Sequence, residues 1–448
     1  MKKIAILTLS IILNLQVTAQ ENPKKCITTS IVKKELENNP EYRIMRQNLV
    51  NYQKENTENN FENQVAITIP VVIHIVHRTQ DNIGANTNIS NAQIEDQLRI
   101  LNEDFSKTNP EFPTPPRSTF ISYAGNADIK FCLATTDPDG NSTTGITRTP
   151  TSKTSWDADD DDEKNYMKRT NQGGIDNWDP LRYMNIWICN LSNSSGGGQT
   201  LGYAYLPGIQ ASNQAWKDGL VVDYKWFGTI ENASSSSDGR TPTHEIGHYL
   251  GLSHTFCESG GCCDNDNNSQ WGLSVDDTPA TDDNIYFGTV NANTNNNTCD
   301  DTFYGFGSDL LDMDENYMSY ASDTWMFSNG QASVMNDVLS ASTWQGGRSE
   351  LKNSTVSVNC TGLIGTGLNN YQLENLNIYP NPTLGKLNII SADKINTLSI
   401  TNIIGKEILF IKDFSAKTID LSSYKNGVYF ININTDKGTH IEKIIITK

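Results

Sequence analysis

Basic residues are scarce in this chain of 448 residues, and long apolar runs are scarcer still. There are 34 lysines and arginines against 52 aspartates and glutamates, which gives a formal net charge of -18. A nucleic-acid partner would require a basic surface, so this balance argues against one. After the N-terminal residues, no stretch approaches the roughly 20 apolar residues that a membrane-spanning helix needs. The composition therefore favours a protein that is soluble outside a cell.

The N-terminal residues predict a secretion signal. Lys2 and Lys3 precede a largely apolar stretch from Ile4 to Val17, and Val17-Thr18-Ala19 provides the small residues of a cleavage site. We expect residues 1–19 to be removed, so that the exported chain begins near Gln20. The length and the 36% hydrophobic content then predict two or three domains, at least one with a substantial core.

Histidine is also rare, yet three of the six histidines lie between His244 and His254, in the sequence HEIGHYLGLSH. In a helix of about 3.6 residues per turn, His244 and His248 share one face, with Glu245 beside them. Gly251 has the conformational freedom to end the helix and turn the chain, which brings His254 round as a third nitrogen donor.

Three neutral imidazoles with one free coordination position are typical of a catalytic zinc site, where the ion lowers the pKa of its water to about 7. Glu245 could then act as the general base and afterwards protonate the leaving amine. This arrangement predicts hydrolysis of peptide bonds. The alternatives are a closed structural zinc site or histidines that only form hydrogen bonds, but neither explains Glu245 and Gly251 at these positions.

The motif HExxHxxGxxH, followed by a methionine in the segment ENYMSY, resembles the signature of the metzincin metallopeptidases. Further segments match the pappalysin family within the metzincins, in family order between about residues 68 and 345: FCLATTDPDGNSTTGITR, GGIDNWDPLRYMNIWICNL, LGYAYLP, GRTPTHEIGHYLGLSHTF, DDTPA and MFSNGQ. The resemblance implies that Met318 lies in a tight turn beneath the zinc. It also implies that Tyr320 stabilises the tetrahedral intermediate.

The resemblance implies an α/β metzincin catalytic domain with a mixed, mostly parallel sheet, and the apolar pattern agrees with it. The β-branched run Ile67 to Arg78 predicts a buried strand, and Asn91 to Phe105 has the apolar spacing of a helix. Ile129 to Ala134 and Met184 to Leu191 are expected to be further strands. Leu201 to Pro207 resembles the edge strand that binds extended substrates in the family.

The residues between the signal and the first strand, 20–62, are predicted to be a propeptide with a helical pattern around Ile31 to Tyr52. A plain polar linker is the alternative. In pappalysin-type zymogens a cysteine thiolate of the propeptide occupies the zinc, and the resemblance assigns this role to Cys26. The sequence departs from the family motif here, because Ile27 stands where glycine is common.

The segment Cys257 to Asp314 is rich in Asn, Asp and Gly and has little periodicity, so we expect a long loop stiffened by disulfides and calcium. By resemblance, the candidate calcium ligands are Asp276, Asp277 and Thr278. A turn with solvated carboxylates is the alternative.

The chain contains eight cysteines. If Cys26 is reserved for zinc, seven remain and at least one must be unpaired. By resemblance to relatives, either Cys262 or Cys263 is expected to pair with Cys299.

Substrate preference is predicted from one residue. Relatives that favour a basic residue near the scissile bond have an acidic side chain after the methionine turn, and Asp323 occupies that place. The local sequence departs from the family, because Trp325 stands where a cysteine is common. Asp323 could equally be a turn residue.

Residues 362–371 form a Gly-rich linker, and the following residues 372–448 contain short apolar strands that alternate with turns. This rhythm predicts a small all-β sandwich. The phrases NIYPNPTLGKL, NIIGKEI and LSSYKNGVYFI resemble the C-terminal sorting domain of type IX secretion, which implies export through the outer membrane. A generic adhesive or carbohydrate-binding sandwich is the alternative.

Together these patterns predict a signal peptide (1–19), a propeptide (20–62), a metallopeptidase domain (63–361), a linker and a sorting domain. We expect a monomeric zinc endopeptidase that is made as a zymogen, acts on proteins or peptides, and is secreted or attached to the cell surface. A non-catalytic binding protein on a metzincin scaffold is the alternative function, although it would be expected to lose a ligand or the base. A thermolysin-like enzyme would use a distant glutamate instead of His254.

Overall fold

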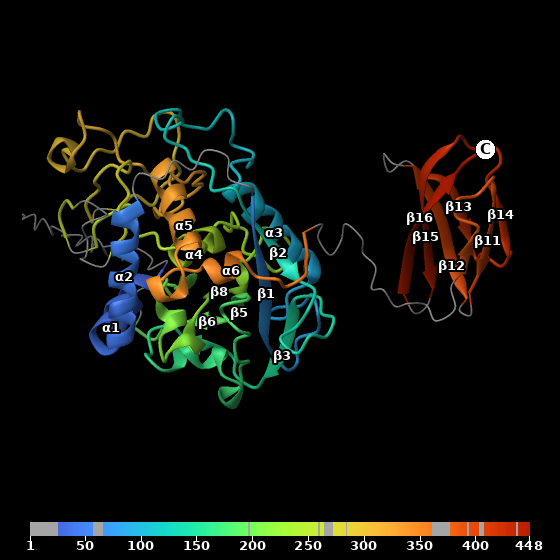
Figure 1. Ribbon diagram of the computed structural model, residues 1–448, viewed down its shortest axis with the longest axis horizontal. Helices are drawn as coiled ribbons and strands as arrows, with labels where there is room; N and C mark the ends of the chain where they lie inside the picture. The colour runs from blue at the N-terminus through green and yellow to red at the C-terminus, as the bar shows by residue number, and fades with distance from the viewer. Residues whose placement is uncertain are drawn as a thin grey trace, which may run out of the picture.

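The computed structural model describes residues 26–56, 66–195, 198–258, 260–263, 272–283, 285–360, 377–391, 394–402, 407–435 and 438–448. The predicted signal peptide and the Gly-rich linker lie outside these ranges. The described residues form a large α/β domain and a separate C-terminal β-domain (Figure 1). No helix among them has both the length and the apolar character needed to cross a membrane.

The α/β domain is built on one mixed sheet of seven strands with the order β7-β8-β5-β1-β2-β9, in which β3 also pairs with β1. Its strands are β1 (Ile67–Arg78), β2 (Ile129–Ala134), β3 (Ile146–Thr151), β5 (Met184–Cys189), β7 (Gly202–Ala204), β8 (Leu220–Asp223) and β9 (Val358–Asn359). Strands β2, β3 and β5 run parallel to β1, and β8 runs parallel to β5, whereas β7 and β9 are antiparallel edge strands. The expectation of a mixed, mostly parallel sheet is confirmed. A two-stranded sheet pairs β4 (Trp156–Asp157) with β6 (Leu191–Ser192).

Both faces of the central strand β1 are buried, which explains its nearly continuous apolar sequence. Ile69, Val71 and Ile73 belong to the main core cluster, which also contains residues of α3 and α4. On the opposite face, Val76 packs in a second cluster. The sheet is therefore covered on both sides, and its end strands β7 and β9 are short.

Helices α3 (Asn91–Phe105) and α4 (Thr241–Tyr249) contact each other, and α4 also contacts β7 and β8. Ser90 caps α3 by accepting a hydrogen bond from the Gln93 amide, and the buried positions of α3 recur at helical spacing. The predicted bounds of β1, α3 and β2 are those of the structure. Because α4 packs beneath the edge strand β7, the histidine motif lies directly below the strand predicted to bind substrate.

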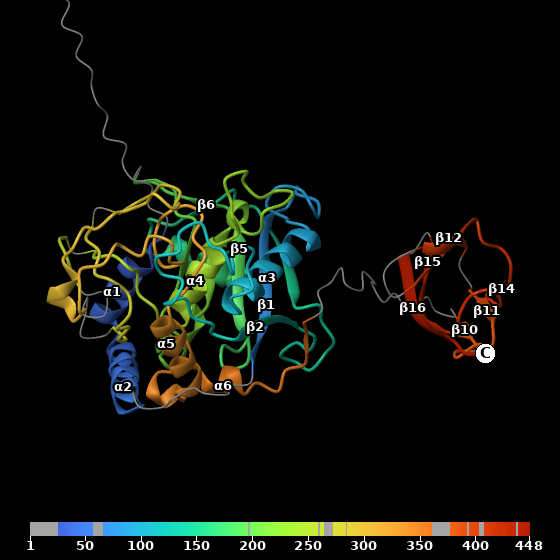
Figure 2. The ribbon, with the colours of Figure 1, turned by 90° about the horizontal axis from the view of Figure 1, so that it is seen from above.

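The predicted helical pattern of the propeptide corresponds to two helices, α1 (Thr28–Asn38) and α2 (Pro40–Asn56). Pro40 has no amide hydrogen and restricts the residue before it, so Asn39 is extended and separates the helices. Both views place them side by side on one flank of the α/β domain (Figures 1 and 2). Ile31 and Tyr42 pack in the same cluster as Val76, so this segment covers part of one face of the sheet.

Residues 251–328 are here named the loop region and residues 66–250 the sheet region; where the structure describes the loop region, it has almost no regular structure. Within the described part of the loop region the only helix is a short 3-10 turn, η6 (Asp301–Tyr304). The loop region leads into α5 (Asn329–Ser340) and α6 (Ser349–Lys352). The other 3-10 turns are η1 (Glu163–Lys168), η2 (Thr170–Gln172), η3 (Ile209–Ala211), η4 (Ala215–Lys217), η5 (Tyr224–Trp226) and η7 (Thr343–Gln345).

The C-terminal β-domain consists of a three-stranded sheet, β10-β11-β14, and a four-stranded sheet, β13-β12-β15-β16. Its strands are β10 (Asn377–Tyr379), β11 (Lys386–Ile390), β12 (Ile395–Asn402), β13 (Glu407–Lys412), β14 (Thr418–Asp420), β15 (Gly427–Thr435) and β16 (Gly438–Ile446). The strand pairings within the two sheets are antiparallel, and one apolar cluster draws residues from both sheets. The predicted small all-β domain is confirmed.

Candidate active site

The helix that carries the histidine motif ends where the motif requires the chain to turn. Pro242 lies in the first turn of α4, where a proline costs no hydrogen bond. The helix ends at Tyr249, and Gly251 follows with φ of +100°, a left-handed conformation that an L-residue adopts only with strain. The turn brings His254 back toward the helix.

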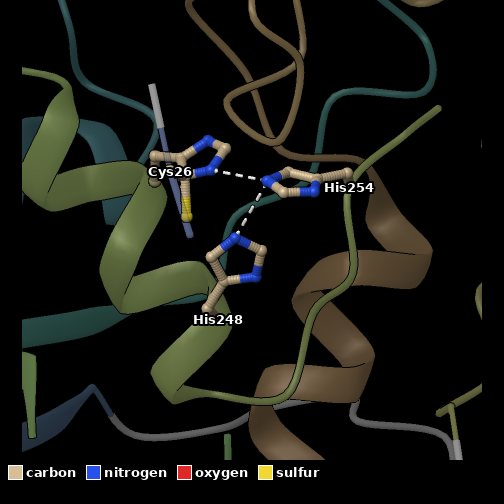
Figure 3. A group of neighbouring side chains, drawn as sticks. Cys26, His248 and His254 are labelled. Carbon is tan, nitrogen blue, oxygen red and sulfur yellow. Dashed lines mark hydrogen bonds between the residues drawn. The ribbon is translucent and has the colours of Figure 1, made fainter. Parts of the chain in front are cut away.

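The three histidines of the motif converge on one point. Nε2 of His254 lies 3.1 Å from Nε2 of His244 and 3.1 Å from Nε2 of His248. Nitrogens at about 2.0–2.1 Å from a tetrahedral zinc ion lie roughly 3.3 Å apart, so this spacing fits the ion. Figure 3 shows His248, His254 and Cys26 directed toward the same centre from different segments of the chain.

In His244 and His248, the hydrogen bond of Nδ1 identifies which ring nitrogen carries the proton and which can bind a metal ion. Nδ1 of His244 lies 2.7 Å from the Tyr317 carbonyl, and Nδ1 of His248 lies 2.8 Å from the Leu252 carbonyl. Carbonyl oxygens only accept, so both Nδ1 atoms carry the proton and both Nε2 atoms present lone pairs. Burial and His254 lower the pKa of His248 to about 3, which keeps this ring neutral. Lone pairs that face one another at this spacing repel unless a cation lies between them, so the donor set fits a zinc ion.

Glu245 lies beside this centre and is 1% exposed. Burial raises its pKa to about 8, against the lowering effect of hydrogen bonds from Cys26 and Thr28. The carboxylate accepts a hydrogen bond of 3.3 Å from the Thr28 hydroxyl and lies 3.5 Å from the Cys26 thiol. A buried carboxyl group with a raised pKa beside a metal site has the properties of a general base.

The N-terminal segment runs through the site along the edge strand. Cys26 forms a parallel bridge with Gly202 of β7, and the Ala204 amide donates a 3.0 Å hydrogen bond to the Thr28 hydroxyl. Among the described residues, the one group of possible metal ligands consists of Cys26 and the three histidines, whose ligand atoms lie within 4.8 Å of one another. The segment therefore lies along the edge strand β7 with its cysteine beside the three histidines.

Met318 and Tyr320 lie below and beside the histidines. A Cβ atom at Gly247 would clash with the sulfur of Met318, so the methionine packs directly against the helix. The Tyr320 ring centroid lies 5.0 Å from that of His254, and its hydroxyl donates a 3.4 Å hydrogen bond to the Cys26 carbonyl. A hydroxyl in this place can donate to a carbonyl oxygen bound at the centre.

Two residues of the site were missed in the sequence. Glu258 accepts a hydrogen bond from Nδ1 of His254, as a carboxylate that orients a metal-binding histidine does. Its position four residues after His254 is the signal that could have identified it. Arg117 lies far away in the sequence, and it forms a buried ion pair with Glu315 at the start of the methionine turn. No local pattern pointed to Arg117.

A cavity of about 220 Å³ opens beside His244. Its lining includes Asp238 before α4, Tyr317 in the methionine turn and Asp323 after that turn. Asp323 is exposed and has φ of +58°, so it is a turn residue that also lines the cavity. Trp325 is buried in an apolar cluster.

The candidate calcium region lies at the N-terminus of α5. The carboxylate of Asp277 accepts hydrogen bonds from the Ser328 hydroxyl, 2.6 Å, and from the Gly330 amide, 2.8 Å. Asp276 accepts one from Ser274, and Thr278 is buried. Asp277 thus stabilises the start of the helix through the Gly330 amide of its first turn.

Three disulfides connect described cysteines. Cys262 pairs with Cys299, and Cys257 pairs with Cys263, both within the loop region. The third joins Cys132 of β2 to Cys360, 228 residues later, and was not expected from the sequence. Cys26 and Cys189 are buried free thiols.

Comparisons with known proteins agree with this geometry. The model of the pregnancy-associated plasma protein-A peptidase family matches residues 168–340, and that of the secretion system C-terminal sorting domain matches residues 377–447. An extracellular metalloprotease of Pyricularia oryzae is 31% identical over 219 residues, which are 48% of this chain and 58% of the relative. One from Arthroderma benhamiae is 27% identical over 271 residues, 59% of this chain and 75% of the relative.

Two solved structures of Tannerella forsythia proteins are similar over most of their length. Mature mirolysin in complex with a cleaved peptide has 35% identity and a TM-score of 0.53, and the match covers 65% of this chain and 97% of mirolysin. A promirolysin variant has 30% identity and a TM-score of 0.58, with 74% and 97% covered. The sorting domain identifies a protein exported by type IX secretion. The chain belongs to the pregnancy-associated plasma protein-A, or pappalysin, family of metallopeptidases, as its sequence predicted.

Proposed function

We propose that this protein is a secreted zinc endopeptidase that cleaves protein or peptide substrates and is made as a latent zymogen. The observation that carries the proposal is the convergence of three imidazole nitrogens beside a buried carboxyl group, with Nε2 of His254 3.1 Å from Nε2 of each of the other two histidines. In this proposal His244, His248 and His254 hold the ion. A zinc ion held by these residues would polarise the scissile carbonyl and acidify the attacking water.

The protein groups would share the remaining chemistry. Glu245 takes the proton from the attacking water and passes it to the leaving amine. Tyr320 donates a hydrogen bond to the oxygen on which negative charge develops. Met318 supports the base of the site by packing against α4. The antiparallel edge strand β7 offers backbone groups to an extended substrate, the role predicted for residues 201–207.

Latency is assigned to the N-terminal segment. Cys26 is the fourth ligand of the precursor, and it is supported in this role by its place among the three histidines. Thr28 adds to the effect because its hydroxyl bonds both the proposed base and the Ala204 amide. The segment runs parallel to β7 at Gly202. Removal of the segment would free the ion, the base and the edge strand together.

The proposed processing divides the chain into the signal peptide 1–19, the propeptide 20–62, the metallopeptidase domain 63–361, the linker 362–371 and the sorting domain 372–448. The pairing of β9 with β2 and the disulfide between Cys132 and Cys360 support a domain end after Cys360. After export the mature domain is free or attached to the cell surface, as a monomer.

Two finer assignments belong to the same proposal. Asp323, an exposed carboxylate on the cavity wall, favours substrates with Lys or Arg beside the scissile bond. The loop around Asp276, Asp277 and Thr278 binds a structural calcium ion. Cleavage of a peptide library without enrichment of Lys or Arg would contradict the first, and calcium titration of the purified chain tests the second.

The function is tested by casein cleavage with the proteolytically activated protein and its Glu245→Ala variant. Loss of a general base lowers kcat by about 10²–10⁴-fold. Glu163→Ala, which removes a surface carboxylate paired with Lys153, is the matched control and should cleave as the unaltered protein does. Equal cleavage by the Glu245→Ala variant would contradict the proposal.

A further inference from the structure

One of the three histidines is oriented by a distant part of the chain. Nδ1 of His248 and Nδ1 of His254 are each bonded four residues further along, at Leu252 and Glu258. Nδ1 of His244, in contrast, donates to the carbonyl of Tyr317, 73 residues away. Its orientation therefore depends on how the methionine turn is held against α4.

Asp104, in the last turn of α3, connects these two elements. Its Oδ2 accepts a 2.7 Å hydrogen bond from the hydroxyl of Thr243, the residue just before His244. Its Oδ1 accepts a 2.7 Å hydrogen bond from the hydroxyl of Tyr317, the residue whose carbonyl bonds His244. One carboxylate thus fixes both the helix that carries the histidine and the acceptor that orients its ring.

A carboxylate is an unexpected side chain at this buried position if Asp104 only fills space in the core. The Asp104 side chain is 0% exposed, and its neighbour Phe105 packs in the main core. Burial raises the pKa of Asp104 to about 6, against the lowering effect of Arg240. Burying a carboxylate costs free energy, and buried ion pairs contribute little net stability, whereas they can fix one arrangement of the groups they bond.

Arg240 places a positive charge near the Asp104 carboxylate, but the hydrogen bonds of its guanidinium group go to another residue. Its Nε lies 3.6 Å from Asp104 Oδ1, while its Nη2 donates to both oxygens of Glu111 at 2.9 Å. The short bonds of Asp104 therefore go to Thr243 and Tyr317.

We propose that Asp104 is a positioning residue for the zinc site, acting through Thr243 and Tyr317 on the orientation of His244. This inference rests on the proposed function, in which His244 binds zinc. Asp104 touches neither substrate nor ion in this role, and its effect reaches the metal through the Nδ1 hydrogen bond.

The test measures zinc affinity of the secreted full chain, by chelator competition after metal removal, for Asp104→Asn, Tyr317→Phe and the double variant. Partners of metal-binding histidines typically contribute 10–100-fold in affinity, so each single variant should bind zinc at least about tenfold more weakly. Because both changes break one connection, the double variant should lose less than the product of the single losses. Cobalt substitution should give altered d–d absorption in the same variants.

Asp223→Asn is the matched control. Asp223 is another buried carboxylate with a pKa raised to about 6 by burial, and it accepts hydrogen bonds from the backbone amides of Leu191 and Lys225. Its loss should lower thermal stability and leave zinc affinity and the cobalt spectrum unchanged.

Unaltered affinity and spectrum in folded Asp104→Asn would overturn the inference, even with a lower melting temperature. If that variant does not fold, Tyr317→Phe, which removes a single hydroxyl, decides by the same criterion. An unaltered protein that binds no zinc would overturn the proposed function as well, so the two failures are distinguishable.

Discussion

The sheet region and the loop region contribute to the same site by different physical means. The sheet region is ordered by apolar side chains that are buried on both faces of β1 and along α3. The loop region is held by two disulfides and by hydrogen bonds such as that from the Thr255 amide to the Met318 carbonyl. In our proposal the sheet region provides α4, which carries two zinc ligands and the general base. The loop region provides His254 and Tyr320. Changes in either region should therefore reach the metal by separable routes.

The largest effect on catalysis from the loop region is expected for Tyr320→Phe. Removal of a donor to a developing oxyanion typically costs about 10²–10³-fold in kcat. KM and zinc content should change little, because the ring and its packing against His254 and Phe256 remain. Steady-state kinetics of the activated protein measure both constants.

Tyr317→Phe provides a comparison for Tyr320→Phe, since it also removes one buried tyrosine hydroxyl. It is expected to act mainly through zinc affinity. A Tyr320→Phe enzyme with unaltered kcat would remove this tyrosine from the mechanism.

The second largest effect is expected on the stability of the loop region, with little change in the sheet region. Replacing Cys262 and Cys299 by serine opens a bridge that spans 37 residues, which corresponds to about 4 kcal/mol of chain entropy in the unfolded state. Hydrogen exchange should accelerate at loop-region amides such as Ser322, whose amide bonds Gly288. Amides of β1 should keep their protection.

Cys189→Ser is the control, because Cys189 is a buried free thiol of the sheet region. It should leave exchange in the loop region unchanged. Equal acceleration in both regions of the double serine variant would show that they unfold as one unit.

Acid should lower the stability of the sheet region because His74 is buried there. Burial lowers its pKa to about 4, against the raising effect of the Asn185 hydrogen bond, from an ordinary value of 6.5. The unfolded chain binds a proton between these values and the folded chain does not, so stability falls as pH drops from about 6.5 to about 4. The full loss is about 3 kcal/mol.

Urea unfolding at pH 7 and at pH 4.5 measures this dependence. His74→Gln should unfold more easily at pH 7 and lose less additional stability in acid than the unaltered protein. An identical acid loss in both would exclude His74 as its source.

The smallest effects are expected at the contacts of α1 with the sheet region. Glu35 and Lys217 are bonded at 2.5 Å and are mostly buried, whereas the ion pair between Lys34 and Asp161 is about half exposed. A synthetic peptide of residues 26–56 should inhibit the activated enzyme. The Glu35→Gln change in this peptide should weaken the inhibition several-fold. Lys34→Gln should change it by less than about twofold, because exposed pairs contribute about 0–1 kcal/mol. Equal effects of the two changes would contradict the ranking.

The comparison also explains how much of the molecule the sequence could predict. Apolar periodicity predicted β1, α3 and β2 with their observed bounds, because burial of the sheet region leaves a local pattern in each element. The three histidines and Glu245 were predicted together because one helix and one turn determine their spacing. The propeptide pattern was predicted as one stretch, whereas Pro40 divides it into α1 and α2.

Contacts between residues far apart in the sequence leave no local sequence pattern. The disulfide between Cys132 and Cys360, the ion pair of Arg117 with Glu315 and the bonds of Asp104 each join residues that are more than 100 positions apart. Their partners are set by the fold, and a single sequence does not reveal them.

The claim that the two regions meet at one zinc ion is tested most directly by the metal content of the purified chain. Elemental analysis of the unaltered protein and of His254→Ala compares a complete donor set with one that lacks the loop-region ligand. We predict one zinc per unaltered chain and loss of most of it in the variant after dialysis against a weak chelator. An unaltered chain without zinc, or a variant that retains it equally, would contradict the account.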